Sequence, residues 1–370
     1  MKKIIILFFL IRIVHAQEVS YKWFNPAASI PAVIGGRGWN DGFEAPYDRL
    51  PARAEKEVRN QLWGLSRHAA GEFIDFNTNS STIVVRYTVK GAQSMPQMPA
   101  TGVSGVDLYA QTKAGLWNWV RGAIKFGDTI EYRFQHISSS QQLKNFRLYL
   151  PLYTAVQWMQ IGVPELNTIN AIPVSGQQSV VAYGTSIMHG AYASRPGLAW
   201  TNILSRKINC PVVNLGFSGN GQLEEPLIDF ISEIDASVYI LDCMPNLWDK
   251  SKFPAEEIEK RMRMSVNRLR AKYPMVPIVF AEHCSGLEGV NMDAEMSEKY
   301  IAVSSIAAQV FKKMKQEGVQ EIYHLSALEI GFDTESTVDG THPNDIGMMK
   351  YAEAYFKIIA PLLNKKPSLK

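Results

Sequence analysis

Ser186, Asp339 and His342 have the residue types that a hydroxyl nucleophile and its base require. Ser186 follows the apolar run 180–183, and His342 lies three residues after Asp339 near the end of the chain. A serine hydroxyl attacks poorly unless a base takes its proton, and a neutral imidazole held by a carboxylate is such a base near neutral pH. One tight turn brings residues three apart together. The pattern predicts acyl transfer with Ser186 as nucleophile, His342 as base and Asp339 orienting His342.

Acyl transfer also needs hydrogen-bond donors aimed at the negatively charged oxygen of the tetrahedral intermediate. Gly219 lies in the glycine-rich turn 217–221, which follows the apolar run 212–216, and such a turn can present a backbone N–H. Asn246 follows a third apolar run, 238–241, and carries a side-chain amide. The Gly219 N–H, the Ser186 N–H and the Asn246 amide are therefore the candidate donors.

The elements that must position these residues alternate from residue 179 onward. Short apolar runs typical of buried strands begin at Val180, Val212, Val238, Ile278 and Ile322. Helical patterns lie after them, at 198–208, 224–234, 255–273, 295–317 and 345–363. This alternation predicts a parallel sheet covered by helices on both faces. The candidate residues follow the carboxyl ends of its strands, where open α/β sheets bind ligands.

The first half of the chain is rich in strand patterns instead. The expected strands are 82–89, 106–111, 116–121, 129–136, 145–153 and 155–161, and the stretch 51–62 is the one expected helix. Short strands at this spacing predict an antiparallel sandwich. The stretch 163–178 contains prolines, glycine and polar residues and is the expected linker. The predicted organisation is therefore a sandwich domain at 17–168 and an α/β domain at 179–370.

These blocks resemble the SGNH (GDSL-type) hydrolase family, named after a Ser, a Gly, an Asn and a His in four blocks. Ser186, Gly219, Asn246 and His342 match them in order, with Asp339 beside the histidine. The resemblance implies a three-layer, flavodoxin-like parallel sheet, and a subgroup of exported bacterial enzymes adds an N-terminal, jelly-roll-like β-sandwich. The first block reads Gly-Thr-Ser instead of Gly-Asp-Ser, which puts in doubt any contact made by the missing Asp. The α/β-hydrolase motif Gly-x-Ser-x-Gly does not fit, because Met188 stands at its last glycine.

Residues 1–16 have the pattern of a cleaved signal peptide: two lysines, an apolar run and Val14-His15-Ala16 before Gln17. An uncleaved anchor is the alternative, but the run is short for a membrane span. Without residues 1–16 the chain carries 35 basic and 35 acidic residues, so its charge favours neither nucleic acid nor an anionic surface as partner. The three cysteines are too few for a disulfide framework, and a Cys243–Cys284 pair is disfavoured because neighbouring parallel strands seldom meet disulfide geometry.

Each candidate also has an ordinary structural reading. Ser186 could cap a helix, Gly219 form a turn, Asn246 start a helix and His342 lie on the surface; jointly and in order, the catalytic reading is preferred. His189 either lines the pocket or is a structural histidine. The histidines show no metal-ligand spacing, so we expect no metal and no cofactor. Four tryptophans of the sandwich, Trp63, Trp117, Trp119 and Trp158, either stack against sugars or belong to the core.

The sequence therefore predicts a secreted or periplasmic serine esterase. By family analogy it removes short acyl groups, most plausibly acetyl, from a small-molecule or glycan ester, with no stable membrane insertion after signal cleavage. A lipase or thioesterase is one alternative. A carbohydrate-binding protein with an inactive hydrolase domain is another, and an acyltransferase would use the same residues. The oligomeric state is open.

Overall fold

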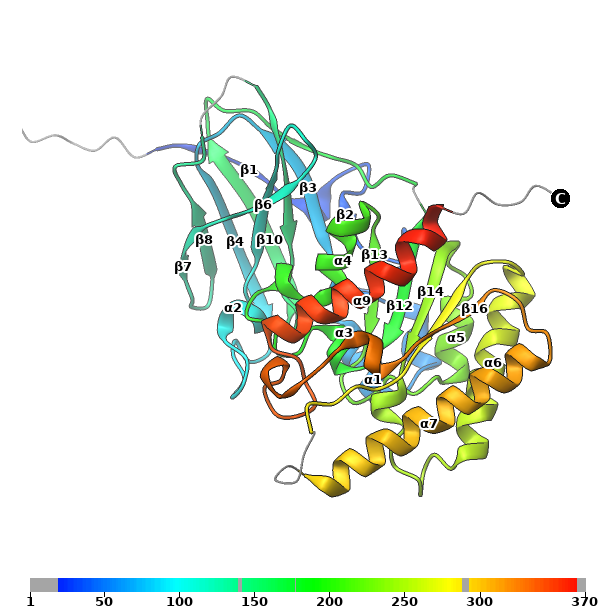
Figure 1. The fold of residues 1–370 in the computed structure, drawn as a ribbon. Coiled ribbons are helices and arrows are strands. Elements are labelled where there is room, and N and C mark those ends of the chain that lie inside the picture. The colour runs from blue at the N-terminus through cyan, green and yellow to red at the C-terminus, as the bar shows by residue number, and fades with distance from the viewer. Residues whose placement is uncertain (1–18, 139–141, 177, 288–292, 365–370) are drawn as a thin grey trace, which may run out of the picture.

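The computed structural model describes residues 19–138, 142–176, 178–287 and 293–364. The expected signal peptide, 1–16, lies outside these residues. Among the described helices, none is long and apolar enough to cross a membrane. A β-sandwich and an α/β layer structure lie side by side (Figure 1).

The sandwich consists of two antiparallel sheets. Sheet A contains, in spatial order, β1 (Tyr21–Phe24), β10 (Ala155–Pro164), β4 (Ile83–Lys90), β8 (Ile130–Phe134) and β7 (Gly122–Lys125). Sheet B contains β11 (Ile169–Ala171), β3 (Phe73–Thr78), β9 (Lys144–Tyr149), β5 (Asp107–Gln111) and β6 (Trp117–Val120), and β2 (Ile34–Gly35) pairs with β3. Alternate side chains of both sheets, such as Val85 and Leu148, fill the core between them. The antiparallel sandwich expected from the strand spacing is confirmed.

Sheet C is parallel throughout, in the order β13 (Val212–Gly216), β12 (Ser179–Gly184), β14 (Ala236–Asp242), β15 (Ile278–Ala281) and β16 (Ile322–Leu325). Taken in chain order this is 2-1-3-4-5, the flavodoxin-like order. Side chains of β12 alternate between two cores: Val180 and Ala182 face one, Val181 and Tyr183 the other. The three-layer α/β fold is confirmed.

Five long helices cover the two faces of sheet C. The face of Val180 packs against α4 (Trp200–Ile208) and α9 (Asp345–Asn364). The face of Val181 packs against α5 (Glu225–Ile231), α6 (Ala255–Lys272) and α7 (Ala294–Gln316). Short helices α2 (Ala100–Val103), α3 (Ser186–His189) and α8 (Ala327–Ile330) lie in the connections. Because a parallel sheet is buried on both faces, its strands read as continuous apolar runs in the sequence.

The expected single helix at 51–62 is wrong. A 3₁₀ helix, Ala52–Lys56, is followed by α1 (Asn60–Ser66), and Arg59 between them has extended backbone angles, φ −59° and ψ 144°. The break lets Arg59 reach the α/β domain, where its Nε donates to Glu224 Oε1 at 2.9 Å. Leu50, Ala54 and Leu62 on this segment pack into the core of the α/β domain.

The expected linker 163–178 also contains structure. Strand β10 continues to Pro164, and β11 pairs with β3. The outer face of sheet B packs on the α/β domain, where the buried Asp107 forms an ion pair with the partly buried Arg195 and accepts the Gly197 N–H at 2.9 Å. All three cysteines, Cys210, Cys243 and Cys284, are free and buried.

Candidate active site

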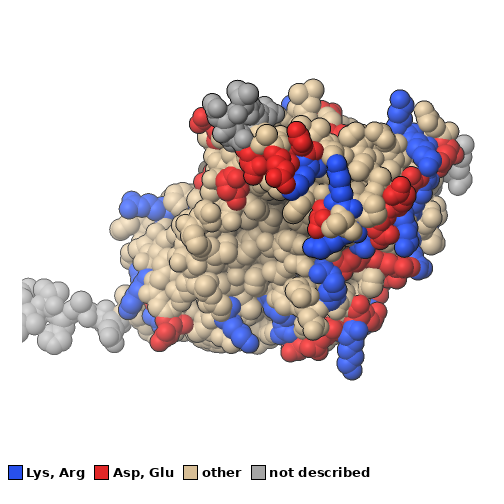
Figure 2. Space-filling model, turned by 90° about the horizontal axis from the view of Figure 1, so that it is seen from below, with Lys and Arg blue, Asp and Glu red and all other residues tan. Residues whose placement is uncertain are grey.

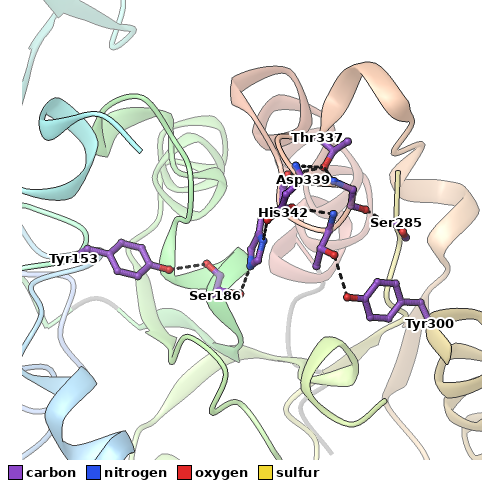
Figure 3. A network of polar contacts seen from close by, with 9 residues as sticks. Tyr153, Ser186, Ser285, Tyr300, Thr337, Asp339 and His342 are labelled. Carbon is purple, nitrogen blue, oxygen red and sulfur yellow. Dashed lines mark hydrogen bonds and ion pairs between the residues drawn. The ribbon is translucent and has the colours of Figure 1, made fainter. Parts of the chain in front are cut away.

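Ser186 lies at the carboxyl end of β12, the central strand at which the strand order of sheet C reverses. It is the first residue of α3, and Thr185 occupies the N-cap position. The Ser186 Oγ lies 2.8 Å from His342 Nε2 (Figure 3), so its hydroxyl contacts the imidazole instead of capping the helix. Ser186 is 7% exposed, more than Thr185 and Ile187 on either side of it, which are almost fully buried.

Asp339 and His342 lie in one turn before α9. Asp339 Oδ2 is 2.8 Å from His342 Nδ1, and its Oδ1 accepts the backbone N–H groups of Thr341 and His342 at 3.0 and 2.8 Å. Burial raises the pKa of Asp339, but the hydrogen bonds and the charge of His342 outweigh burial and lower it to about 2. The carboxylate is therefore ionised at neutral pH and orients the imidazole toward Ser186.

Further hydrogen bonds hold this turn. Thr337 Oγ1 donates to His342 O at 2.9 Å and accepts the Gly340 N–H at 2.8 Å. Ser285 Oγ donates to Gly340 O at 3.0 Å, and Tyr300 and Thr341 hydroxyls are 3.0 Å apart (Figure 3). The position of the imidazole is thus fixed from two neighbouring segments.

Two of the three expected oxyanion donors, Gly219 and Asn246, follow the strands on either side of β12. Gly219 follows β13 and has φ +69°, the left-handed region that glycine adopts without strain. A Cβ at Gly219 would meet no atom of the described residues within 4 Å, so its backbone faces open space. Asn246 follows β14, and its Oδ1 accepts the Gly221 N–H at 3.0 Å. That bond leaves the Asn246 Nδ2 as the donor for a ligand.

Two tyrosines beside the nucleophile were not anticipated. The Tyr153 hydroxyl donates to Ser186 O at 3.4 Å, and the Tyr192 ring lies edge-on to His342 with centroids 5.0 Å apart. Tyr153 belongs to the loop between β9 and β10 of the sandwich, so the N-terminal domain reaches the site. The sequence pattern assigned Tyr153 to the end of the expected strand 145–153, but β9 ends at Tyr149, and a single tyrosine gives no sequence signal for this contact.

His189 is a structural histidine. It is fully buried, its ring stacks on Tyr153 with centroids 4.2 Å apart, and its Nε2 lies 2.8 Å from Leu152 O. Burial and the nearby Arg49 charge lower its pKa well below the ordinary value. His283 is also buried, against Tyr300. No group of three His, Cys, Asp or Glu side chains within the described ranges is placed to hold a metal ion.

The sandwich tryptophans are placed differently from one another. Trp63 does not belong to the sandwich as expected, because it is buried in the core of the α/β domain. Trp117 is half-buried under the Arg147 guanidinium. Trp119 is half-exposed, but its Nε1 donates to Asp107 at 2.6 Å at the domain contact. Trp158 is 37% exposed on sheet A. The first three have structural contacts, and the partly exposed Trp158 is the one whose sugar-stacking interpretation stays a prediction.

A flavodoxin-like sheet with Ser, His and Asp in contact at its carboxyl edge is the arrangement of an α/β acyl hydrolase. Two family models match the chain: the GDSL-like lipase/acylhydrolase family over residues 177–360, and the N-terminus of SGNH-type esterases, GxDLY, over residues 21–169. The chain belongs to the SGNH (GDSL-type) hydrolase family. The letters GxDLY correspond to 105–109, where Asp107 and Tyr109 contact the α/β domain.

Solved structures agree with this assignment. A Bacteroides ovatus protein assigned as a GDSL-like lipase is 29% identical, with a TM-score of 0.84 over 94% of this chain and 99% of that one. The salicylyl-acyltransferase SsfX3 of a tetracycline biosynthetic pathway is 19% identical (TM-score 0.73, 92% and 97% covered). A family two carbohydrate esterase from Clostridium thermocellum, solved with cellohexaose, is 14% identical (TM-score 0.52, 80% and 93% covered). A search of curated proteins gave no match.

Proposed function

We propose that this protein is a secreted or periplasmic serine esterase that removes short acyl groups, acetyl in particular, from carbohydrate. One observation carries the proposal: the continuous contact from Ser186 Oγ through His342 to Asp339, with both distances 2.8 Å. A surface histidine or a capping serine would need neither contact. The residues of the family's four blocks are all present around it.

The proposed reaction follows from this geometry. His342 Nε2 takes the Ser186 proton as Oγ attacks the ester carbonyl, and the N–H groups of Ser186 and Gly219 with the Asn246 amide stabilise the oxyanion. His342 then donates the proton to the departing alcohol oxygen, which leaves an acyl-serine. Water attacks that ester with His342 again as base, and the carboxylic acid departs as the serine is reprotonated. No cofactor takes part in these steps.

Several features support an acylated carbohydrate as the substrate. Carbohydrate esterases share the fold, and the expected signal peptide would bring the enzyme to extracellular glycans. The Tyr192 ring beside His342 combines an apolar face with a hydroxyl, which suits a sugar ring. Figure 2 shows the molecule from the side of the carboxyl edge of sheet C, and the broad middle of this face carries few charges. A neutral acylated glycan fits such a surface.

The test is hydrolysis of p-nitrophenyl acetate, butyrate and octanoate by the mature protein and by Ser186→Ala. We expect acetate to react fastest and Ser186→Ala to lose at least a thousandfold in kcat. Acetylated glycans are then assayed by released acetate. A preference for octanoate would keep the mechanism and refute the carbohydrate assignment, whereas equal inactivity of both proteins would favour a binding protein.

Acyl transfer to an alcohol is a second candidate, since the acyltransferase SsfX3 matches both domains over 92% of the chain. The two functions differ only in which acceptor reaches the acyl-serine. Adding a sugar alcohol to the acetate assay separates them: a transferase forms the acetylated alcohol at the expense of free acetate, and a hydrolase does not.

A further inference from the structure

The turn that carries Gly219 begins at the edge of sheet C. Strand β13 pairs only with β12 in this sheet, and the Phe217 N–H bonds Gly184 O at 2.9 Å on that side. Because successive residues of a strand point their polar groups to opposite sides, Asn214 and Gly216 direct their carbonyls toward the free edge. These carbonyls immediately precede the oxyanion turn and need partners from another part of the chain.

Arg49, from the N-terminal region, supplies these partners. Its Nη1 donates to Asn214 O at 3.0 Å and to Gly216 O at 2.8 Å, and its guanidinium lies 4.8 Å from the centre of the Phe217 ring. Its Nε and Nη2 bind the carbonyls of His68 and Leu65, both at 2.7 Å. The guanidinium is fully buried; burial lowers its pKa to about 10, so it is still charged at neutral pH. Because the Arg49 guanidinium is planar and donates to four backbone carbonyls, these carbonyls fix its orientation.

Two more residues of the N-terminal half bind the same turn beyond Phe217. The Tyr153 hydroxyl interacts with the Ser218 side chain. Arg59 Nη1 donates to Asn220 Oδ1 at 2.8 Å, and its Nη2 reaches Asn220 O at 3.5 Å. Residues of the N-terminal half therefore contact the turn on both sides of Gly219.

We infer that Arg49 and Arg59 are positioning residues that hold the Gly219 N–H in the geometry for oxyanion binding. The N-terminal domain then fixes the position of the Gly219 N–H relative to the oxyanion, in addition to packing on the α/β domain. This inference rests on the proposed esterase function. Disturbing the two arginines should lower kcat and leave KM nearly unchanged, because a donor aimed at the oxyanion acts mainly in the transition state.

The experiment compares Arg49→Lys and Arg59→Gln with Arg53→Gln. Arg53 is the matched control, since its ion pair with Glu233 also joins the two halves of the chain but lies away from the turn. We expect the two test variants to lower kcat on p-nitrophenyl acetate by 10- to 100-fold, with KM within twofold. Affinity for a trifluoromethyl ketone, which forms an oxyanion on Ser186, should weaken by a similar factor. For Arg53→Gln, kcat, KM and the affinity for the ketone should all stay within twofold of wild type.

Hydrogen exchange of peptides spanning 214–224 gives a readout that does not depend on esterase activity. Faster exchange is expected in the test variants and not in Arg53→Gln. If Arg49→Lys does not fold, Arg59→Gln still tests the inference, because the Arg59 side chain is half-exposed and its replacement disturbs the core less. Unchanged kcat and exchange in folded variants would overturn the inference, as would a raised KM at constant kcat. An inactive wild type would refute the proposed function alone, and the exchange data would still decide whether these residues hold the turn.

Discussion

Asp242 offers a quantitative test of the buried electrostatics. This carboxyl ends β14, is 2% exposed, and accepts a hydrogen bond from Tyr355 Oη at 2.8 Å. Burial raises its pKa from 3.8 to about 6, although the Tyr355 hydrogen bond opposes the rise. A folded-state pKa above the unfolded one means that the native state favours the proton. Stability from this group is therefore present at low pH and lost as pH rises from about 4 to about 6.

The magnitude follows from the two pKa values. The interval from 3.8 to about 6, at about 1.4 kcal/mol per pH unit, corresponds to a loss of about 3 kcal/mol at alkaline pH. Asp242→Asn removes the titration and keeps an oxygen for Tyr355. Its extra N–H has a cost of its own, about 1–3 kcal/mol if unpaired, but that cost does not vary with pH.

The assay is urea unfolding followed by tryptophan fluorescence at pH 4, 6 and 8. The stability of Asp242→Asn relative to wild type should rise by about 2–3 kcal/mol from pH 4 to pH 8. Asp249→Asn, at an exposed carboxylate bonded to Ser251, is the control and should show no such rise. A stability difference between Asp242→Asn and wild type that stays constant across these pH values would refute the reasoning.

Three further changes probe the site and the domain contact. Gly219→Ala places a Cβ at a left-handed φ and should lower kcat about tenfold with little change in KM; unchanged kcat would remove the Gly219 N–H from the mechanism. Asn246→Ala removes an oxyanion donor and the acceptor of the Gly221 N–H, so kcat should fall by about 10²- to 10³-fold while acetate binding, measured by competition, persists. Asp107→Ala leaves the partly buried Arg195 and the Gly197 N–H without their acceptor and should cost about 1–3 kcal/mol in urea unfolding, and an unchanged stability would contradict that reading.

The α/β half was the more predictable part of the fold. Strands such as β12 are buried on both faces, and their apolar runs are distinct in the sequence. In the first half, β3 (Phe73–Thr78) and β1 were not predicted, and the helical pattern of 51–62 was interrupted at Arg59. That interruption depends on contacts with Glu224 and Asn220, more than 160 residues away, and no local propensity encodes them.

In the candidate site, too, the residues with a local sequence pattern were predicted, and those that act through distant contacts were not. Ser186, Asp339 and His342 were identified because their types and spacing fit one chemistry, and the structure brings them within hydrogen-bond distance. Arg49 and Tyr153 gave no signal, because an arginine between an aspartate and a leucine, or a tyrosine at the end of an expected strand, fits many roles. Their importance comes only from the three-dimensional contact between the two halves.

The edge of β13 that Arg49 covers has a consequence for producing the two halves of this chain separately. An uncovered strand edge is a template for pairing with another molecule, and Arg49 occupies the carbonyls that such a partner would use. Leu50 and Leu62 cover apolar surface beside it. A fragment that begins at β12 would present both the bare edge and the apolar surface. We therefore expect such a fragment to aggregate when produced alone, and the N-terminal half to keep the α/β half soluble.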